Sequence, residues 1–255
     1  MDVELLRACT HTKSGGAFAR TLSRHALILG FNAISMNEWN PKLEVLPSST
    51  RKALEYARNE TWLGESGWYL AGGTALALQV GHRQSIDLDF FTQEKTFTPA
   101  EVTRHFPDTV WQGKIIKEGT IYGILCKAKV SFIAYPFFVS AVPPLKYGAV
   151  AVLAKEDIAV MKIIAISQRG RKRDFVDLYW YVKNVAPLES VVQKLPRQYP
   201  NIAHNFHHII KALNYFDDAE NDPMPTLFFD ATWEQIKKYF RSEVPRIAKK
   251  MLRLQ

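Results

Sequence analysis

The chain has 255 residues, of which 47% are hydrophobic, so it can bury the core of one domain together with an appended part. Its formal net charge of +8 favours an anionic partner such as nucleic acid, and its two cysteines, Cys9 and Cys126, are too few for a disulfide framework and fit a reducing cytoplasm. No apolar run approaches the roughly twenty residues of a membrane-spanning helix, so we expect no membrane span.

The start of the chain lacks a clear helical or strand period. We predict that residues 1–35 are a weakly ordered upstream segment with no part in catalysis. A core at residues 36–150 and a helical region at residues 151–255, which completes the active site, are expected to follow.

Serines and a threonine at 48–50 can cap a helix at 51–62.

A short apolar run meets a helix-forming run at a pair of glycines. The run Trp68–Ala71 then predicts a buried strand, and residues 74–80 predict a helix that opens directly after Gly72-Gly73. Such a junction presents free backbone N–H groups and the positive end of a helix dipole, which together favour a phosphate.

Two aspartates alternate with apolar residues on the next predicted strand. Asp87 and Asp89 are two residues apart, so their carboxylates share one face, while Leu88 and Phe90 point to the core. Carboxylate oxygens at this spacing can hold one or two Mg²⁺ ions about 3.5–4 Å apart, an arrangement used in phosphoryl transfer.

Each of these motifs alone is more often structural, since glycine pairs form tight turns and Asp-x-Asp occurs on solvated strands. Their order across one strand–helix–strand unit instead indicates a nucleotidyltransferase. The glycines are not a Walker A loop, because no Gly-Lys-Ser/Thr follows them.

The following elements extend the predicted sheet. Pro99 opens a helix to His105, and two strands are expected at 114–117 and 120–126, joined by a turn at Glu118-Gly119. Residues 129–133 read as a further strand.

The helix expected at 156–166 is apolar on every side except at Lys162. An unpaired buried ammonium is costly, so Lys162 must reach solvent, a nucleotide phosphate or a neighbouring aspartate. Asp174 begins the next predicted helix and shares a face with Asp177, although Asp174 could serve merely as its N-cap. The basic turn at 169–173 could meet a triphosphate or an acceptor nucleic acid, or could be a solvated loop.

From Pro187 onward the chain predicts a helical bundle segment. One helix is expected at 202–215 and another at 233–255, interrupted at Pro245. The last helix is strongly basic, which fits either RNA phosphates or a solvated outer face.

Three blocks of this sequence resemble the AbiEii/AbiGii family of nucleotidyltransferase toxins, a branch of the polymerase-β-like superfamily. They are Leu70-Ala-Gly72-Gly73-Thr74-Ala-Leu-Ala-Leu, Gly81-His-Arg83-x-Ser85-x-Asp87-Leu-Asp89-Phe-Phe, and Met161-Lys162 with Arg173-Asp174-Phe-Val-Asp177-Leu-Tyr. The resemblance extends from about Trp39 to Lys183. It implies an α+β fold, with a small mixed β-sheet flanked by helices and a helical C-terminal part.

The resemblance also implies Mg²⁺-dependent transfer of an NMP from an NTP to an acceptor, with a tRNA end as the implied acceptor. The protein would then be a growth-arresting toxin with a separate antitoxin as partner and no membrane association. The implied metal ligands are Asp87 and Asp89. The other implied site residues are Gly72, Gly73, Thr74, Arg83 and Ser85 for the nucleotide, and Lys162, Asp174 and Asp177 for catalysis.

One position departs from the family pattern. A third carboxylate of the superfamily would fall on Ser131, which is neither a base nor a good Mg²⁺ ligand. Two alternatives therefore stay open: a catalytically weak nucleotide- or RNA-binding module, and a nucleotidyltransferase acting on a small molecule.

Overall fold

The computed structural model describes residues 39–201 and 204–251, so the predicted upstream segment 1–35 lies outside the described residues. Within them, a mixed seven-stranded sheet is combined with helices, which confirms the predicted α+β class. No helix of the described part is long and apolar enough to cross a membrane.

The sheet has the strand order β3-β4-β5-β2-β1-β7-β6. Parallel pairing joins β2 to β5 and β1 to β7, and the other neighbours are antiparallel. The strands are β1 (Tyr69–Ala71), β2 (Leu88–Thr92), β3 (Trp111–Lys117), β4 (Thr120–Leu125), β5 (Ala128–Ala134), β6 (Leu145–Tyr147) and β7 (Val150–Val152).

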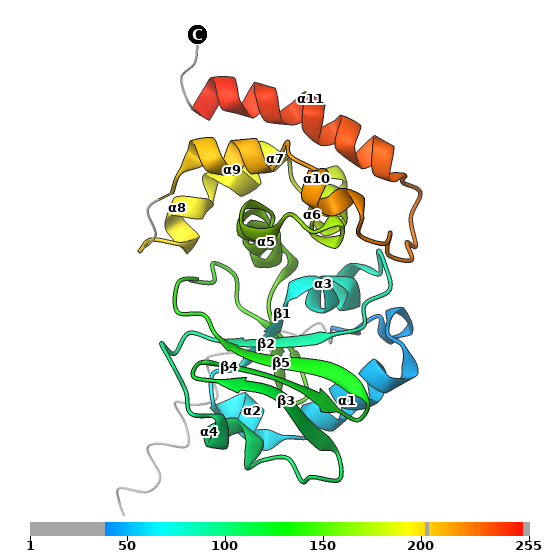
Figure 1. The fold of residues 1–255 in the computed structure, drawn as a ribbon, viewed down its shortest axis with the longest axis vertical. Coiled ribbons are helices and arrows are strands. Elements are labelled where there is room, and N and C mark those ends of the chain that lie inside the picture. Colours follow the sequence, from blue (N-terminus) through cyan, green and yellow to red (C-terminus); the bar gives the residue numbers. More distant parts are fainter. Residues whose placement is uncertain (1–38, 202–203, 252–255) are drawn as a thin grey trace, which may run out of the picture. The chain divides into compact units, whose positions relative to one another are not determined.

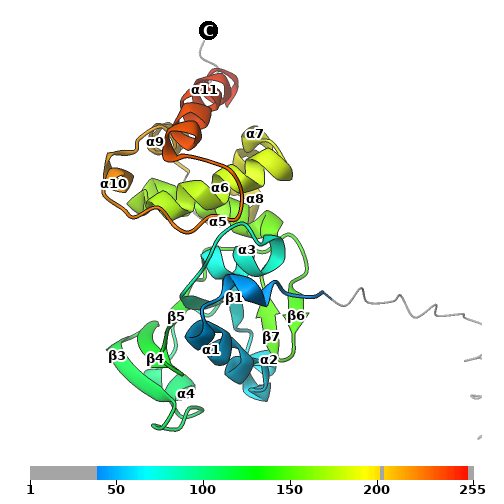
Figure 2. The same ribbon diagram turned by 90° about the vertical axis from the view of Figure 1, so that its right-hand side faces the viewer.

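Helices cover the two faces of the sheet differently. Helices α1, α2 and α4 pack on one side, against β5, β7 and β3, whereas α3, α5 and the helices as far as α11 lie on the other (Figures 1 and 2). The helices are η1 (Leu43–Val45), α1 (Ser48–Arg58), α2 (Thr61–Glu65), α3 (Gly72–Val80), α4 (Pro99–Thr103), α5 (Lys155–Arg169), α6 (Lys172–Asn184), α7 (Leu188–Gln193), α8 (Leu195–Gln198), α9 (Phe206–Ala212), α10 (Asp217–Glu220) and α11 (Trp233–Met251).

The central strand–helix–strand unit follows its predicted pattern. Leu88 and Phe90 of β2 are buried, and the Phe90 ring stacks on Phe132 of β5 at a centroid distance of 5.1 Å. Because side chains alternate along a strand, burying these residues turns Asp87 and Asp89 to the opposite face, toward α3 and α5. The core therefore fixes the direction of both carboxylates.

Three helix predictions were wrong in their limits or continuity. Within the described residues, the helix expected at 202–215 is confined to α9, Phe206–Ala212. The helix expected at 51–62 starts at Ser48 after Pro47 and is broken near Asn59 into α1 and α2. Helix α11 continues through Pro245, although proline removes one backbone donor. Its buried face, which includes Phe240, supplies packing that outweighs that lost hydrogen bond.

Strands β6 and β7 were not predicted. They are three residues long, and β7 is buried against β1, so neither shows the alternation that marks a half-buried strand. Strand β7 lies at the predicted boundary between the core and the helical region.

Candidate active site

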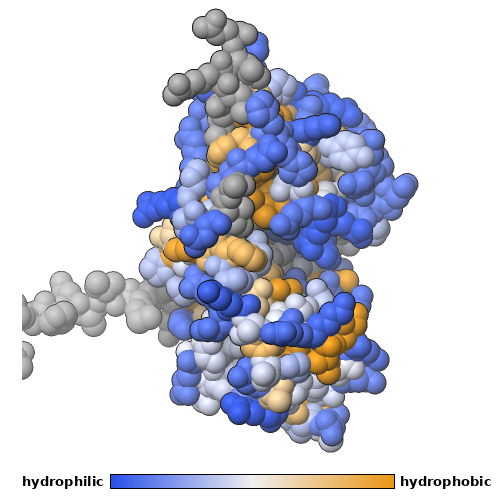
Figure 3. All heavy atoms as spheres, turned by 60° about the vertical axis from the view of Figure 1, so that its left-hand side comes forward, coloured by the Kyte–Doolittle hydropathy of each residue, from blue (hydrophilic) through white to orange (hydrophobic). Residues whose placement is uncertain are grey.

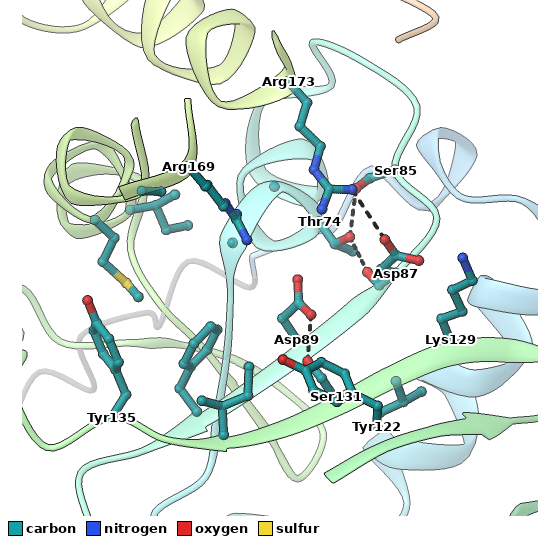
Figure 4. A pocket seen from close by; sticks show the side chains of 18 of the residues that line it. Thr74, Ser85, Asp87, Asp89, Tyr122, Lys129, Ser131, Tyr135, Arg169 and Arg173 are labelled. Atoms are coloured by element: carbon teal, nitrogen blue, oxygen red, sulfur yellow. Dashed lines mark hydrogen bonds and ion pairs between the residues drawn. The ribbon is translucent and has the colours of Figure 1, made fainter. Parts of the chain in front are cut away.

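A pocket of about 610 Å³ opens where the face of the sheet that carries Asp87 and Asp89 meets α3, α5 and the start of α6. Figure 4 shows Asp89 near its centre, with Tyr135 and Arg169 on one side and Asp87 and Lys129 on the other. Of the described residues that line it, Asp87 and Asp89 are the carboxylates. The pocket therefore has an acidic centre within an otherwise basic and apolar wall.

Hydroxyl groups hold the aspartate-bearing segment against α3. The Thr74 hydroxyl is 2.7 Å from that of Ser85 and donates to the backbone carbonyl of Asp87. Both hydroxyls line the pocket but are buried. Thr74 and Ser85, predicted to bind nucleotide, thus also fix the position of Asp87.

The two carboxylates differ in their surroundings. Asp89 accepts a hydrogen bond of 2.5 Å from Ser131, its partner in the β2–β5 register. Asp87 Oδ2 lies 3.3 Å from Arg173, while its buried Oδ1 has no hydrogen-bond partner among the described residues. A buried carboxylate oxygen without a hydrogen-bond partner is suited to act as a ligand of a metal cation. Hard oxygen donors of this kind suit Mg²⁺.

Gly72 brings the first turn of α3 against the carboxylates. Its φ of +71° is in the left-handed region, and a Cβ atom there would lie 3.3 Å from Asp89 Oδ2. The preceding residue, Ala71, has no side-chain group to cap the helix. The N-terminus of α3 therefore faces the pocket with its backbone N–H groups available to an anion.

Gly73 is required for a different reason, because a Cβ atom there would lie 2.0 Å from Arg83 Nη2 and 3.0 Å from Asp177 Oδ2. We predict that Gly73→Ala displaces the Arg83 guanidinium and lowers the free energy of unfolding in a urea titration. The control is Gly64→Ala in α2, where the new Cβ meets its nearest neighbour at 3.4 Å and stability should not fall. Equal stability of the two variants would contradict the proposed close approach.

A buried ionic cluster lies directly behind the pocket. Arg83 donates from Nε and Nη2 to the two oxygens of Asp177 at 2.6 and 3.0 Å. Lys162 Nζ lies 2.6 Å from both Asp174 and Asp177. His82 Nε2 adds a contact of 2.7 Å to Asp177. Of the three partners left open for Lys162, which were solvent, a phosphate and an aspartate, the structure shows aspartates at salt-bridge distance, and two of them.

The pocket brings most predicted site residues together. Gly72, Gly73, Thr74, Arg83, Ser85, Asp87, Asp89 and Lys162 line it. Asp174 and Asp177 do not; both are fully buried beneath Lys162 and Arg83. The N-cap interpretation of Asp174 was wrong, because Arg171 is the N-cap of α6 and Asp174 is inside the helix.

The basic residues of the turn between α5 and α6 form two pairs with different contacts. Arg169 and Arg173 line the pocket, and Arg169 also lies 3.1 Å from Asp174. Arg171 instead pairs with Asp222 at 3.0 Å, and the buried Lys172 donates to backbone carbonyls of the same loop. The first pair can meet an anion, whereas the second pair anchors the C-terminal region.

The C-terminal region also supports the site. Residues 82–84 pair antiparallel with residues 226–228 through backbone hydrogen bonds of 2.8 and 2.9 Å. This pairing fixes the backbone that carries Arg83. Sequence patterns gave no signal of it, because both segments are irregular.

The family model described as "Nucleotidyl transferase AbiEii toxin, Type IV TA system" matches residues 62–118 and 123–251, more than half of the chain. The chain belongs to the AbiEii family of nucleotidyltransferases. Over 188 residues it is 34% identical to an uncharacterized protein of Aquifex aeolicus (strain VF5), covering 69% of this chain and 86% of that protein.

Two solved structures are similar at lower identity. JHP933 from Helicobacter pylori is 16% identical with a TM-score of 0.47, covering 82% of this chain and 95% of its own. MenT4, a nucleotidyltransferase toxin from Mycobacterium tuberculosis H37Rv, is 13% identical with a TM-score of 0.44, covering 79% of this chain and 89% of its own. Membership of the AbiEii family rests on the family model and the Aquifex relative.

Charge and burial oppose each other in the ionic cluster of this AbiEii nucleotidyltransferase. Burial would raise the pKa of Asp177, but Arg83 and Lys162 outweigh it and hold that pKa well below its ordinary value. Burial would also raise the pKa of Asp174, but the adjacent Lys162 and Arg169 outweigh it and lower that pKa. At His82, burial lowers the pKa despite the adjacent Asp177 carboxylate. Each of these groups therefore stabilises the fold above its unfolded pKa.

We predict a measurable pH dependence from His82. Its folded pKa lies below the unfolded value of about 6.5, so its stabilising effect is full above that pH and is lost as the pH falls through the folded pKa. In urea titrations, wild type should lose more stability than His82→Gln between about pH 7 and pH 5. The exposed His207, changed to Gln, is the control and should retain the wild-type slope. Parallel slopes for wild type and His82→Gln would contradict this role.

Several lining residues of the AbiEii pocket were not identified from the sequence. They come from β3, β4, the ends of β2 and β5, and α5, and they include Phe91, Lys114, Ile115, Tyr122, Lys129, Tyr135, Met161 and Gln168. The strands themselves were predicted, but the sequence of β4, Thr-Ile-Tyr-Gly-Ile-Leu, has no polar–apolar alternation that would separate exposed Tyr122 from buried Ile121 and Leu125. Which face of β4 meets the aspartates depends on the strand order.

Proposed function

We propose that this AbiEii nucleotidyltransferase transfers an NMP from an NTP to the end of a tRNA, with Mg²⁺, as the toxin of a toxin–antitoxin or phage-defence system. The observation that carries the proposal is the meeting of Asp87 and Asp89 with the N-terminus of α3 in one pocket. Phosphate-binding N–H groups and metal-binding carboxylates are the two features that NMP transfer requires in one place.

Four pocket side chains and the start of α3 would have direct roles in this reaction. Asp87 and Asp89 would hold Mg²⁺, which stabilises negative charge on the phosphates when bound. The N-terminus of α3, with Arg169 and Arg173, would bind the β- and γ-phosphates. An acceptor hydroxyl attacks the α-phosphorus, the bond to the β-phosphate breaks, pyrophosphate leaves, and the hydroxyl proton passes to solvent.

The ionic cluster would act by positioning. Lys162 and Arg83 line the pocket, but the shortest contacts of Lys162 go to Asp174 and Asp177, and that of Arg83 goes to Asp177. They would set the potential at the triphosphate and hold α3, α5 and α6 in register. The two buried aspartates would then be positioning residues that keep these cations in place.

A tRNA acceptor is supported by charge and by pocket composition. The formal net charge is +8, and the basic residues Lys114 and Lys129 extend the pocket wall beyond the carboxylates. NTPs and tRNA both occur in the cytoplasm, where we propose that the protein acts and where a separate antitoxin would hold it in check.

Transfer can be tested directly with purified protein, Mg²⁺, each of the four NTPs labelled at the α-phosphate, and total tRNA. We expect label on tRNA with at least one NTP and none when EDTA is added. Label on a small molecule in place of tRNA would support the small-molecule alternative. Binding of NTP without transfer would support a catalytically weak module, in line with Ser131 at the place of a third carboxylate.

A further inference from the structure

A row of four side chains leads from Asp89 to the edge of the sheet. Asp89 of β2 pairs in register with Ser131 of β5, Ser131 with Tyr122 of β4, and Tyr122 with Ile115 of β3. All four line the pocket. Because neighbouring strands are about 4.8 Å apart, the three steps of this row span about 14 Å.

The outer half of the row is exposed. Tyr122 is 44% and Ile115 is 50% exposed, whereas Ile121 and Leu125 point to the core from the same β4 strand. A register shift between Gly113 and Ile115 marks a bulge at Lys114, and bulges redirect side chains. Lys114 accordingly lines the pocket beside Ile115.

Two ammonium groups border this apolar surface. Lys129 pairs in register with Ile124 on β4, and both line the pocket together with Lys114. Among the described residues, neither lysine has a carboxylate within salt-bridge distance. Figure 4 shows Lys129 and Tyr122 beside the two aspartates. Aromatic and apolar surface flanked by unpaired cations complements a single nucleic acid strand, through base stacking and phosphate contacts.

The other half of the pocket is better suited to the nucleoside of the NTP. It lies under α5 and is lined by Phe91, Tyr135 and Met161, none of which is as exposed as Tyr122. Figure 4 shows Tyr135 on the side of Asp89 away from Lys129. The two halves thus meet at the carboxylates, where donor phosphate and acceptor hydroxyl must also meet.

We propose that the β3–β4 hairpin face, defined by Lys114, Ile115, Tyr122 and Lys129, binds the single-stranded 3′ end of the acceptor RNA. This inference rests on the proposed function and specifies how its acceptor is held. The terminal bases stack on Tyr122 and Ile115, the lysines contact phosphates, and the terminal hydroxyl points to Asp89. A length of about 14 Å accommodates about four stacked nucleotides at a rise of 3.4 Å each. Hydrophobic surface beside hydrophilic side chains is visible on the sheet-bearing half in Figure 3.

The test measures RNA binding separately from transfer. A fluorescently labelled single-stranded oligonucleotide with the 3′-terminal sequence of tRNA is titrated with protein, without NTP, and anisotropy is recorded. We expect Tyr122→Ala to weaken binding by about 5- to 100-fold and Tyr122→Phe to bind as wild type. Tyr215→Ala is the matched control, since Tyr215 is also 44% exposed but does not line the pocket, and its binding should be unchanged.

Two further measurements separate a contact from a folding effect. The double variant Lys114→Ala/Lys129→Ala should reduce the dependence of log affinity on log salt by about 1.4, as expected for two lost phosphate contacts on a single strand. In the wild-type protein, a 4-thiouridine at the oligonucleotide 3′ end should crosslink to the peptide that contains Tyr122.

The outcomes also separate this inference from the proposed function. Wild-type binding by Tyr122→Ala, equal loss in Tyr122→Phe, or an oligonucleotide that wild type does not bind would overturn the hairpin site. If wild type binds RNA through Tyr122 yet transfers no label to tRNA, the hairpin site stands and the proposed reaction fails. If wild type and Tyr122→Ala both transfer label equally well, the reaction stands and the hairpin site fails.

Discussion

Asp89→Asn is expected to abolish NMP transfer while leaving the fold intact. Asparagine keeps the size of the side chain and can still accept the hydrogen bond from Ser131, but it removes the charge that a divalent cation needs. Metal-dependent charge stabilisation is worth several kcal/mol, so the rate should fall by about 10³-fold or more. Asp87→Asn should have a comparable effect, since its buried Oδ1 has no partner among the described residues.

A binding measurement makes this prediction independent of the acceptor. The melting temperature of wild type should rise when EDTA is replaced by Mg²⁺ or Mn²⁺, because a ligand that binds the native state stabilises it. Neither aspartate variant should show that rise, whereas Asp230→Asn, an exposed control away from the pocket, should show it in full. An active Asp89→Asn enzyme, or a metal-induced rise that survives in both variants, would refute the metal assignment.

Lys162→Met is expected to destabilise the protein strongly. Its ammonium is 2.6 Å from Asp174 and from Asp177, and both carboxylates are fully buried. Methionine would leave these carboxylates with one cation fewer in a region that excludes water. Removing one partner of a buried ion pair typically costs about 3–5 kcal/mol, and the free energy of unfolding should fall by this amount.

The control is a lysine with two exposed partners. Lys237 contacts Glu220 and Glu234, whose side chains are 43% and 74% exposed, so water can replace the lost cation after Lys237→Met. The loss of stability at Lys237 should therefore be much smaller. Adding Asp174→Asn to Lys162→Met should lower stability by less than the sum of the single changes, because the stranded charge is then removed. A Lys162→Met protein as stable as wild type would refute the structural role of this lysine.

The strand–helix–strand unit was predictable because its signals are local. The apolar run before Gly72, the helix-forming run after Gly73 and the alternation around Asp89 depend on neighbouring residues alone, and β1, α3 and β2 follow them closely. The turn at Gly119, with its φ of +66°, was predictable for the same reason.

Partner choice in the ionic cluster was not predictable. The sequence required an anion for Lys162 because its helix is apolar, but it left solvent, phosphate and aspartate open. Helices α5 and α6 pack so that Asp174 and Asp177 both reach the lysine. Arg83 and His82 join the cluster through contacts with Asp177, which lies 94 and 95 positions away in the sequence.

The sequence by itself therefore determined that a helix begins at the glycine pair and that Asp87 and Asp89 share one face of their strand. Tertiary structure decided which distant groups meet these residues. Strand order places β5 next to β2 and β4 next to β5, so Ser131 and Tyr122 continue the row that starts at Asp89. The physical reason is that periodicity constrains the direction of a side chain, whereas pairing between strands and packing between helices are set by the whole core.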